Sequence, residues 1–217
     1  MLEEVSNYLN QIRHDFAQQS LNEEDVLDSP IEQYAKWFEE AVGAQVLDPK
    51  AVVITTVNLD SKPSSRVVYV RGVSEEGFVI YTNYNSAKGD DLAVNPNVSL
   101  NIFWPELERQ IRIEGRAKKV DTSISDAYFA SRPRESQIGA WASAQSSTLK
   151  DRAELEQKVE ELTKKFEGKE IERPPFWGGY LIQANYFEFW QGRPSRLHDR
   201  IAFELAQEKW IKKRLSP

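Results

Sequence analysis

The spacing of apolar residues divides the chain into helical and strand-like segments. Near the N-terminus, apolar side chains recur every three or four positions over residues 5–16, which predicts an amphipathic helix. A polar, acidic loop follows it. Ser29 and Pro30 then predict a helix start, because a serine caps free N–H groups and a proline fits the first turn. The apolar face of this second helix continues to Val42, and we expect it to end at Gly43.

From Ala51 the apolar period changes to that of β-strands. β-branched and aromatic runs separated by turn residues predict strands over residues 51–58, 65–70, 78–82, 98–104, 110–117, 180–184, 186–190, 201–205 and 210–215. Helical spacing predicts further helices over residues 87–94, 121–131 and 149–167. Strands come in runs and do not alternate strictly with helices. We therefore expect a mainly β, α+β protein with an antiparallel or mixed barrel and peripheral helices.

Composition narrows the class of protein. The 217 residues are 40% hydrophobic, which is enough for a packed core, and the absence of cysteine excludes disulfides, thiolate zinc sites and cysteine nucleophiles. The N-terminus has no signal-peptide pattern and no apolar run could span a membrane, so we expect a cytoplasmic protein that binds no membrane. A net charge of -6 argues against nucleic-acid binding. Any anion site must therefore be a local cluster of Arg and Lys.

The common phosphate and metal motifs are missing from the sequence. It contains neither a P-loop nor a dinucleotide-binding glycine fingerprint, so a phosphorylated ligand would have to be held by side-chain cations. Two histidines do not make a metal site, and no serine stands in a G-x-S-x-G elbow. Metalloenzyme and hydrolase functions are therefore weak hypotheses, and we expect no metal.

Cations near the ends of predicted strands are the candidates for binding an anion. Arg66 and Arg71 bracket an apolar strand segment, and residues five apart face opposite sides of a strand, so each could reach a different ligand. Lys88 lies at a predicted helix start, where free amides attract anions. The alternative is that Arg66 and Arg71 are ordinary solvated charges and that the segment with Lys88 is an ordinary N-capped helix.

A second candidate cluster is spaced four residues apart, at Tyr128, Arg132 and Ser136. Pro133 disfavours helix at Arg132, so we expect Tyr128 on a helix and the other two side chains on the loop after it. Two hydroxyls and one guanidinium would make a clasp for a phosphate. Core packing is the alternative role for Tyr128.

Residues 189–200 read F-W-Q-G-R-P-S-R-L-H-D-R, and they include three arginines and one of the two histidines of the chain. An aromatic wall and a tight loop precede Arg196, His198 and Arg200. Arginine supplies a rigid fork of donors for phosphate or carboxylate, and histidine exchanges a proton near neutral pH. This composition suits an anionic, planar ligand.

Four blocks together, residues 131–141, 175–179, 188–200 and 214–217, resemble the pyridoxine (pyridoxamine) 5'-phosphate oxidase family of FMN enzymes. The resemblance runs from about residue 10 to the C-terminus. It implies an FMN-binding split β-barrel that dimerises, with FMN between the subunits.

The resemblance also implies one domain over residues 1–217. Residues 1–28 would form an N-terminal helix and lid, residues 29–170 the FMN-binding barrel with its helices, and residues 171–217 the strands for dimerisation and substrate binding.

By position, the resemblance assigns FMN contacts to Arg66, Val67, Val68, Tyr69, Val70, Arg71, Tyr81, Thr82, Lys88, Gln110, Gln145, Ser146, Trp190 and Arg200. It assigns substrate contacts to Arg13, Arg71, Tyr128, Arg132, Ser136, Arg196, Leu197 and His198. Within these sets, Arg66 and Lys88 would bind the FMN phosphate. Arg196 and His198 would lie against the pyridine ring as catalytic residues, and which of them is the base stays open.

The implied activity is oxidation of pyridoxine 5'-phosphate or pyridoxamine 5'-phosphate to pyridoxal 5'-phosphate. A hydride passes from substrate C4' to flavin N5, and O2 then reoxidises the flavin and yields hydrogen peroxide, with ammonia released from the amine. The protein supplies orientation and charge. The alternatives are a general flavin oxidoreductase, a non-catalytic FMN or pyridoxal phosphate carrier, and a purely structural homodimer.

Three positions depart from the family pattern: Arg71 stands in place of Lys, Ala87 in place of Arg and Phe16 in place of Tyr. Arg71 keeps the charge with a different geometry. We expect these changes to alter ligand affinity more than the class of reaction.

Overall fold

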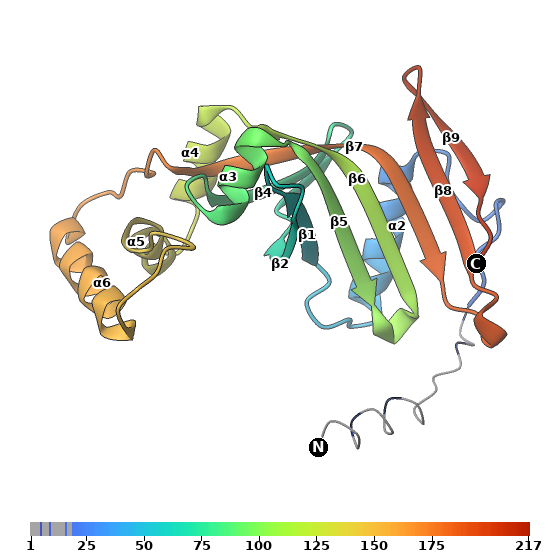
Figure 1. The fold of residues 1–217 in the computed structure, drawn as a ribbon, viewed down its shortest axis with the longest axis horizontal. Coiled ribbons are helices and arrows are strands. Elements are labelled where there is room, and N and C mark those ends of the chain that lie inside the picture. Colours follow the sequence, from blue (N-terminus) through green and yellow to red (C-terminus); the bar gives the residue numbers. More distant parts are fainter. Residues whose placement is uncertain (1–4, 6–8, 10–15, 17–18) are drawn as a thin grey trace. The chain divides into compact units, whose positions relative to one another are not determined.

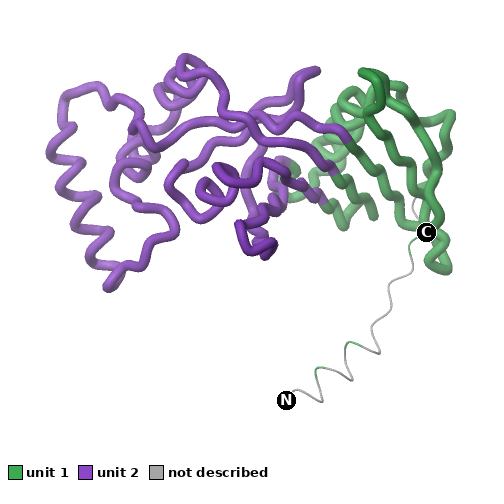
Figure 2. Tube along the Cα trace, turned by 45° about the horizontal axis from the view of Figure 1, so that its top comes forward, with its two compact units in different colours: residues 1–49, 103–112, 186–217 green, residues 50–102, 113–185 purple. Residues whose placement is uncertain are grey.

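A computed structural model describes residues 5, 9, 16 and 19–217. The chain forms two compact units, each assembled from segments that are distant in sequence (Figure 2). Unit 1 comprises residues 1–49, 103–112 and 186–217, and unit 2 comprises residues 50–102 and 113–185. No helix among the described residues is both long and apolar enough to cross a membrane.

In the described part of the chain, nine strands form one sheet (Figure 1). They are β1 (Ala51–Val57), β2 (Pro63–Tyr69), β3 (Gly72–Ser74), β4 (Gly77–Asn83), β5 (Asn97–Trp104), β6 (Arg109–Lys119), β7 (Trp177–Gln191), β8 (Asp199–Ala206) and β9 (Lys209–Arg214). The order is β2-β1-β5-β6-β7-β4-β3, and β8 pairs with both β7 and β9. The pairs β1–β2, β1–β5, β3–β4, β4–β7, β7–β8 and β8–β9 are antiparallel.

The described helices are α2 (Pro30–Gly43), α3 (Ala87–Val94), α4 (Thr122–Ala130), α5 (Arg134–Ala142) and α6 (Arg152–Phe166), with 3-10 turns η1 (Pro105–Leu107) and η2 (Pro194–Arg196). Their starts follow the local sequence. Ser29 Oγ accepts a hydrogen bond from the Glu32 N–H at 3.3 Å, and Asp151 caps α6 in the same way through the Glu154 N–H at 3.0 Å. The acidic and hydroxyl caps thus fix where these helices begin.

Unit 2 has an apolar core between its strands and helices. Alternate residues of β1 and β4, among them Ile54 and Ile80, are fully buried, as the period of two requires. A second cluster joins Phe129 of α4, Ile138 of α5 and Trp177 of β7. This cluster fixes α4 and α5 against the strands that carry the site described below.

Unit 1 packs α2 against the C-terminal strands. The Trp37 ring meets the Phe189 ring edge-on at 5.2 Å, and the Arg109 guanidinium lies 4.4 Å from the Trp37 ring centroid. Strands β7 and β8 pair Phe189 with Ile201 and Trp190 with Arg200. Alternation along β7 therefore buries Phe189 and leaves Trp190 on the opposite face.

Most predicted elements are confirmed to within a few residues, and so is the mainly β, α+β class. The predicted separate strands at 180–184 and 186–190 are wrong: they are one 15-residue strand, β7, because β4 pairs with its first half and β8 with its second. Strand β3 and helix α5 were not predicted. The predicted helix at 5–16 lies mostly outside the described residues, although Val5 and Leu9 are helical.

The turn that begins β4 depends on Gly77. Its φ of 134° is unfavourable for any side chain, and a Cβ there would lie 2.0 Å from the carbonyl oxygen of Ile182. Glycine is therefore required for β4 to pair closely with β7, and this pairing positions the residues at the end of β4.

Candidate functional site

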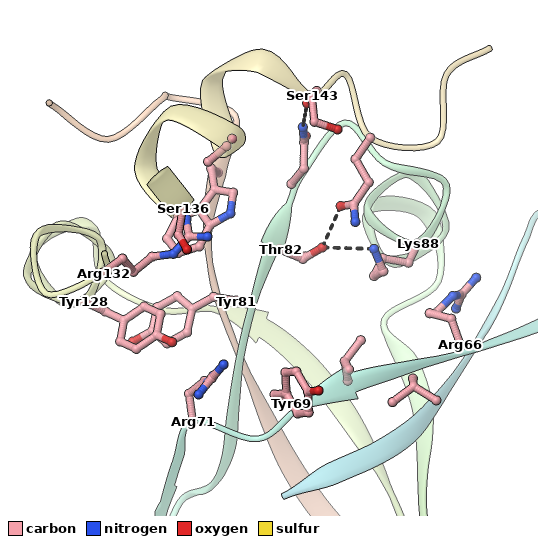
Figure 3. A pocket seen from close by; sticks show the side chains of 17 residues that line it. Arg66, Tyr69, Arg71, Tyr81, Thr82, Lys88, Tyr128, Arg132, Ser136 and Ser143 are labelled. Carbon is pink, nitrogen blue, oxygen red and sulfur yellow. Dashed lines mark hydrogen bonds between the residues drawn. The ribbon is translucent and has the colours of Figure 1, made fainter. Parts of the chain in front are cut away.

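Unit 2 contains a cavity of about 640 Å³ at the ends of β2 and β4 (Figure 3). This volume is within the range of small-molecule sites. The cavity is lined by Arg66, Val67, Val68, Tyr69, Arg71, Tyr81, Thr82, Asn83, Lys88, Tyr128, Arg132, Ser136, Gly139, Ala140, Ser143, Gln145 and Trp177. Residues that are up to 111 positions apart in the sequence, from Arg66 to Trp177, thus face one space.

Lys88 and Arg66 form one cationic end of the cavity (Figure 3). The Lys88 ammonium donates to Thr82 Oγ1 at 3.0 Å and to Ser86 Oγ at 3.3 Å. The Thr82 hydroxyl in turn donates to Gln145 Oε1 at 3.2 Å. Arg66 donates to the Thr56 hydroxyl at 2.7 Å. Neutral oxygens therefore hold both cations in place.

The charge at this end is not fully compensated. Among the described carboxylates none pairs with Lys88, and Asp91 lies 4.0 Å from the Arg66 guanidinium. Burial, followed by repulsion from Arg66, lowers the pKa of Lys88 to about 8. Burial also lowers the pKa of Arg66, and Asp91 offsets this in part. A bound anion would relieve both effects, so this end favours a phosphate.

A stack of aromatic rings forms another wall of the cavity. The Tyr81 and Tyr128 rings are nearly parallel (Figure 3), with centroids 3.8 Å apart. The Tyr81 ring also stacks on the Trp177 ring, with centroids 5.5 Å apart. Burial and the neighbouring Tyr128 raise the pKa of Tyr81, which keeps its hydroxyl neutral. The stack thus offers flat apolar faces with phenol groups at the edge.

Arg132 and Arg71 form a second cationic end beside this stack (Figure 3). The Arg132 guanidinium lies 4.6 Å from the Trp177 ring centroid, and its Nη1 is buried with no hydrogen-bond partner among the described residues. Burial lowers the pKa of Arg132, Tyr128 opposes this, and Arg71 adds to it. The Arg71 N–H is bound to the Val79 carbonyl at 2.8 Å, which fixes the backbone beside β4.

An unpaired, buried guanidinium nitrogen costs free energy unless a ligand accepts its hydrogen bond. Arg132 therefore marks the second end as a site for an anionic group.

The positions of residues that line the cavity correct two predictions. Ser136 was expected on a loop but lies on α5, because Pro133 ends one helical segment and directly precedes the next. The second prediction was that Arg66 and Arg71 face opposite sides of one strand, and this prediction is also wrong. Arg71 lies in the connection between β2 and β3, so the chain turn, not the pleat, directs it.

The cavity brings together many of the residues that the sequence analysis selected: Arg66, Val67, Val68, Tyr69, Arg71, Tyr81, Thr82, Lys88, Tyr128, Arg132, Ser136 and Gln145. Val70 is buried and does not line it. Ser146 lines a neighbouring cavity of about 370 Å³ that shares Gln145. Arg13 lies outside the described residues.

The other selected residues, Gln110, Trp190, Arg196, Leu197, His198 and Arg200, belong to unit 1. There, Arg196 and Leu197 are exposed and His198 is half-buried. The Arg200 Nε donates to Glu188 at 2.8 Å, and Arg112 binds the other oxygen of the same carboxylate at 2.9 Å. Burial raises the pKa of Glu188, but the two arginines outweigh it and the net pKa is lowered. A buried, ionised Glu188 thus holds Arg200 in place.

Some residues at these sites were missed by the sequence analysis. Trp177 is one of them, and it lines the cavity. The two glycines that follow it leave room for tyrosine side chains: a Cβ at Gly178 would lie 2.2 Å from the Tyr84 hydroxyl, and a Cβ at Gly179 would lie 2.9 Å from the Tyr81 ring. The Trp-Gly-Gly sequence could have indicated that this segment packs closely against other residues. Glu188 was missed because the sequence around a carboxylate on a strand does not show which distant residues will pair with it.

The chain matches known proteins along most of its length. Residues 38–166 match the family model described as Pyridoxamine 5'-phosphate oxidase, and residues 177–217 match the one described as Pyridoxine 5'-phosphate oxidase C-terminal dimerisation region. Identity to the pyridoxine/pyridoxamine 5'-phosphate oxidase of Acaryochloris marina is 47% over 217 residues, which covers 100% of this chain and 99% of that protein. Identity to the enzyme of the same name from Mannheimia succiniciproducens is 48% over 209 residues, covering 96% and 99%.

Solved structures show the same fold. PhzG from Burkholderia lata, solved in complex with tetrahydrophenazine-1-carboxylic acid, superposes with a TM-score of 0.88 at 29% identity, covering 94% of this chain and 100% of that one. A pyridoxamine 5'-phosphate oxidase-related, FMN binding protein from Nostoc punctiforme has a TM-score of 0.69 at 16% identity, covering 87% and 98%. The second likeness concerns the fold alone.

Proposed function

We propose that this chain, which belongs to the pyridoxamine 5'-phosphate oxidase family, is an FMN-dependent oxidase that makes pyridoxal 5'-phosphate. Its substrates are pyridoxine 5'-phosphate and pyridoxamine 5'-phosphate, and O2 is the electron acceptor. The names of relatives at 47% and 48% identity over nearly the whole chain support this assignment.

The observation that carries the proposal is the pair of cationic ends in one cavity. Lys88 and Arg66 lie at one end and Arg132 and Arg71 at the other, with stacked aromatic rings beside them. Two phosphorylated, planar molecules need two separate anion sites and flat surfaces between them. A protein that bound FMN alone would have no use for the buried Nη1 of Arg132, which has no hydrogen-bond partner in the part of the chain that the structure describes.

The residues at the Lys88 end fit the phosphate of FMN. Lys88 and Arg66 supply positive charge, and Thr82 and Gln145 supply polar atoms next to it. When bound, FMN accepts the hydride from substrate C4' and passes the electrons to O2, which leaves as hydrogen peroxide. The assignment of Gln110, Ser146, Trp190 and Arg200 to FMN rests on the family resemblance.

Arg71, Tyr128, Arg132 and Ser136 bind the substrate phosphate in this proposal. Their binding energy positions C4' against the flavin, and holding two reactants face to face supplies several kcal/mol of the barrier reduction. The assignment of Arg196 and His198 to the pyridine ring, which they would orient, rests on the family resemblance. Arginine stays protonated in proteins, so Arg196 acts as a donor and as a positive charge.

The active form in this proposal is a homodimer with FMN at the interface, and residues 1–217 work as one functional domain. The description of the model that matches residues 177–217, a dimerisation region, supports the dimer. The lack of cysteine agrees with a cytoplasmic location.

A general flavin oxidoreductase is the second candidate. It would keep the Lys88 end but would not need Arg132 and Arg71 at the other end, and the presence of these cations favours the oxidase.

The absorbance spectrum of the purified protein tests the proposal. We expect a visible flavin band that bleaches when pyridoxine 5'-phosphate is added without oxygen and returns when air is admitted. A protein that takes up no FMN, or whose flavin band is unchanged by the substrate, would contradict the assignment. Unphosphorylated pyridoxine at the same concentration is the control, and it should bleach the band far more slowly.

A further inference from the structure

The loop between β7 and β8 carries Arg196 in a strained conformation. Ser195 has φ 57° and Arg196 has φ 62°, so two consecutive residues that are not glycine lie in the left-handed region. Each such residue costs about 1–2 kcal/mol. One backbone hydrogen bond, from Leu197 N–H to the Pro194 carbonyl at 3.1 Å, closes the turn. Strain at this place requires further contacts that hold the loop.

His198 supplies one such contact across the loop. Its Nδ1 accepts a hydrogen bond from the Arg193 backbone N–H at 3.1 Å. The ring is held from two sides: its centroid lies 4.6 Å from that of Trp190 and 5.5 Å from that of Phe16, which meets it nearly edge-on. The orientation of the imidazole is therefore fixed by one backbone group and two aromatic rings.

The neighbouring charges do not compete for this ring nitrogen. Asp199 accepts hydrogen bonds from the Leu21 N–H at 3.0 Å and from Arg214 at 2.9 Å, and its carboxylate lies 3.5 Å from the Arg193 guanidinium. Among the described residues nothing hydrogen-bonds to His198 Nε2. The ring thus has one occupied nitrogen and one that is available to a ligand.

This arrangement selects one neutral form of the imidazole. A nitrogen that accepts a hydrogen bond must carry a lone pair, so the single proton of the neutral ring is on the other nitrogen, Nε2. A second proton could go only to Nδ1, where it would face the Arg193 N–H. Burial and the positive Arg196 also lower the pKa of His198, and Asp199 opposes them.

We propose that the Arg193 N–H fixes His198 as the Nε2-protonated tautomer, so that this histidine donates a hydrogen bond to the substrate ring and holds the Arg196 loop, and is not the general base. Arg196 is also a donor. Neither residue then accepts the proton that the C4' substituent of the substrate loses, and this proton passes to water. The role toward substrate rests on the proposed oxidase function, whereas the tautomer and the loop contact do not.

The tautomer can be measured without FMN or substrate. The chain has only two histidines, His14 and His198, so a long-range ¹H–¹⁵N correlation spectrum of the labelled protein contains two imidazoles, and His14→Gln identifies them. At a pH above the titration of His198, we expect a protonated Nε2 and a bare Nδ1. A protonated Nδ1, or an equal mixture of the two forms, would overturn the proposal.

Two variants separate the loop contact from the donor role. His198→Asn keeps an acceptor near the place of Nδ1, and His198→Ala removes it. Hydrogen exchange of the Arg193 amide should be close to wild type in the Asn variant and at least about tenfold faster in the Ala variant. Equal exchange in all three proteins would exclude the loop contact.

The donor role is tested with His198→Gln, whose side-chain amide can donate near the place of Nε2 but cannot act as a base. With pyridoxine 5'-phosphate we expect the kcat/KM of this variant to be within about tenfold of wild type, which corresponds to a loss of transition-state stabilisation below about 1.4 kcal/mol. We also expect the decline of kcat/KM toward acid pH to be the same as in wild type. A loss above about 100-fold together with loss of that decline would show that His198 is the base. If the wild type has no oxidase activity but shows the Nε2 tautomer, the proposed function fails and the loop assignment stands.

Discussion

Replacing Lys88 should have opposite effects on the FMN-free protein and on FMN binding. We predict that Lys88→Met stabilises the FMN-free protein at pH 7 and weakens its affinity for FMN. The residue is 6% exposed, and burial and then Arg66 lower the pKa of Lys88 from 10.5 to about 8. A charged ammonium in this place costs folding free energy until an anion compensates it.

The size of both effects follows from the structure. One pKa unit corresponds to about 1.4 kcal/mol, so the shift in the pKa of Lys88 from 10.5 to about 8 sets an upper limit of about 3–4 kcal/mol for the gain in stability. The variant loses the hydrogen bonds to Thr82 and Ser86, and we therefore expect a net gain of about 1–2 kcal/mol. Loss of a charged hydrogen bond to the phosphate costs about 1.5–3 kcal/mol, which raises the Kd for FMN about 10- to 150-fold.

The pH dependence has a definite sign. Between pH 8 and pH 10.5 the unfolded chain holds the Lys88 proton and the FMN-free folded protein does not, so this group makes stability rise with pH across that window. The difference in stability between Lys88→Met and wild type should therefore shrink as the pH rises. Wild-type affinity for FMN should fall above about pH 8, because binding then has to take up a proton.

Chemical denaturation of the FMN-free proteins at pH 7 and pH 10 measures the first effect, and quenching of flavin fluorescence on titration measures the second. Lys62→Met is the matched control, since this side chain is 76% exposed, and we expect its stability to change by less than about 0.5 kcal/mol with no change in Kd. If Lys88→Met destabilises the protein at pH 7, or binds FMN as tightly as wild type, the argument from uncompensated charge is wrong.

Three further changes test other parts of the structure. Arg132→Met should raise KM for pyridoxine 5'-phosphate at least about tenfold with a smaller change in kcat, because it removes a charged hydrogen bond to the phosphate; with unphosphorylated pyridoxine, variant and wild type should perform alike, and a defect of equal size there would contradict the assignment. Arg196→Met should slow turnover, and a loss smaller than about threefold, or ~0.7 kcal/mol, would argue against a role at the pyridine ring. Gly77→Ala should lower the free energy of unfolding by more than about 2 kcal/mol, because the new Cβ would meet the Ile182 carbonyl, whereas Gly43→Ala, which has open space around it, should change it by less than about 1 kcal/mol in urea denaturation.

Local patterns in the sequence predicted most elements correctly because their causes are local. Ser29 and Pro30 start α2 through a cap and a fixed φ, and neither needs a distant partner. Alternating β-branched residues predicted β1 and β4 for the same reason. Helix α5 was not predicted, because Pro133 was interpreted as the end of a helix, although a proline can equally precede the start of one.

Contacts between distant segments depend on the tertiary structure. The pairing of β4 with the first half of β7 and of β8 with its second half makes β7 one continuous strand, and no local pattern contains that information. The same holds for Trp177, which meets Tyr81 only because β4 and β7 are neighbours in the sheet.

The sequence by itself therefore determined which residue types could bind phosphate and, through a family resemblance, where to look for them. Only the tertiary structure decided that Lys88 is buried with no carboxylate partner among the described residues, that Arg132 Nη1 finds no hydrogen-bond partner in the same part of the chain, and that His198 accepts a backbone hydrogen bond. The physical reason is that local conformation depends on neighbouring residues in the chain, whereas desolvation and charge compensation depend on which distant segments pack together.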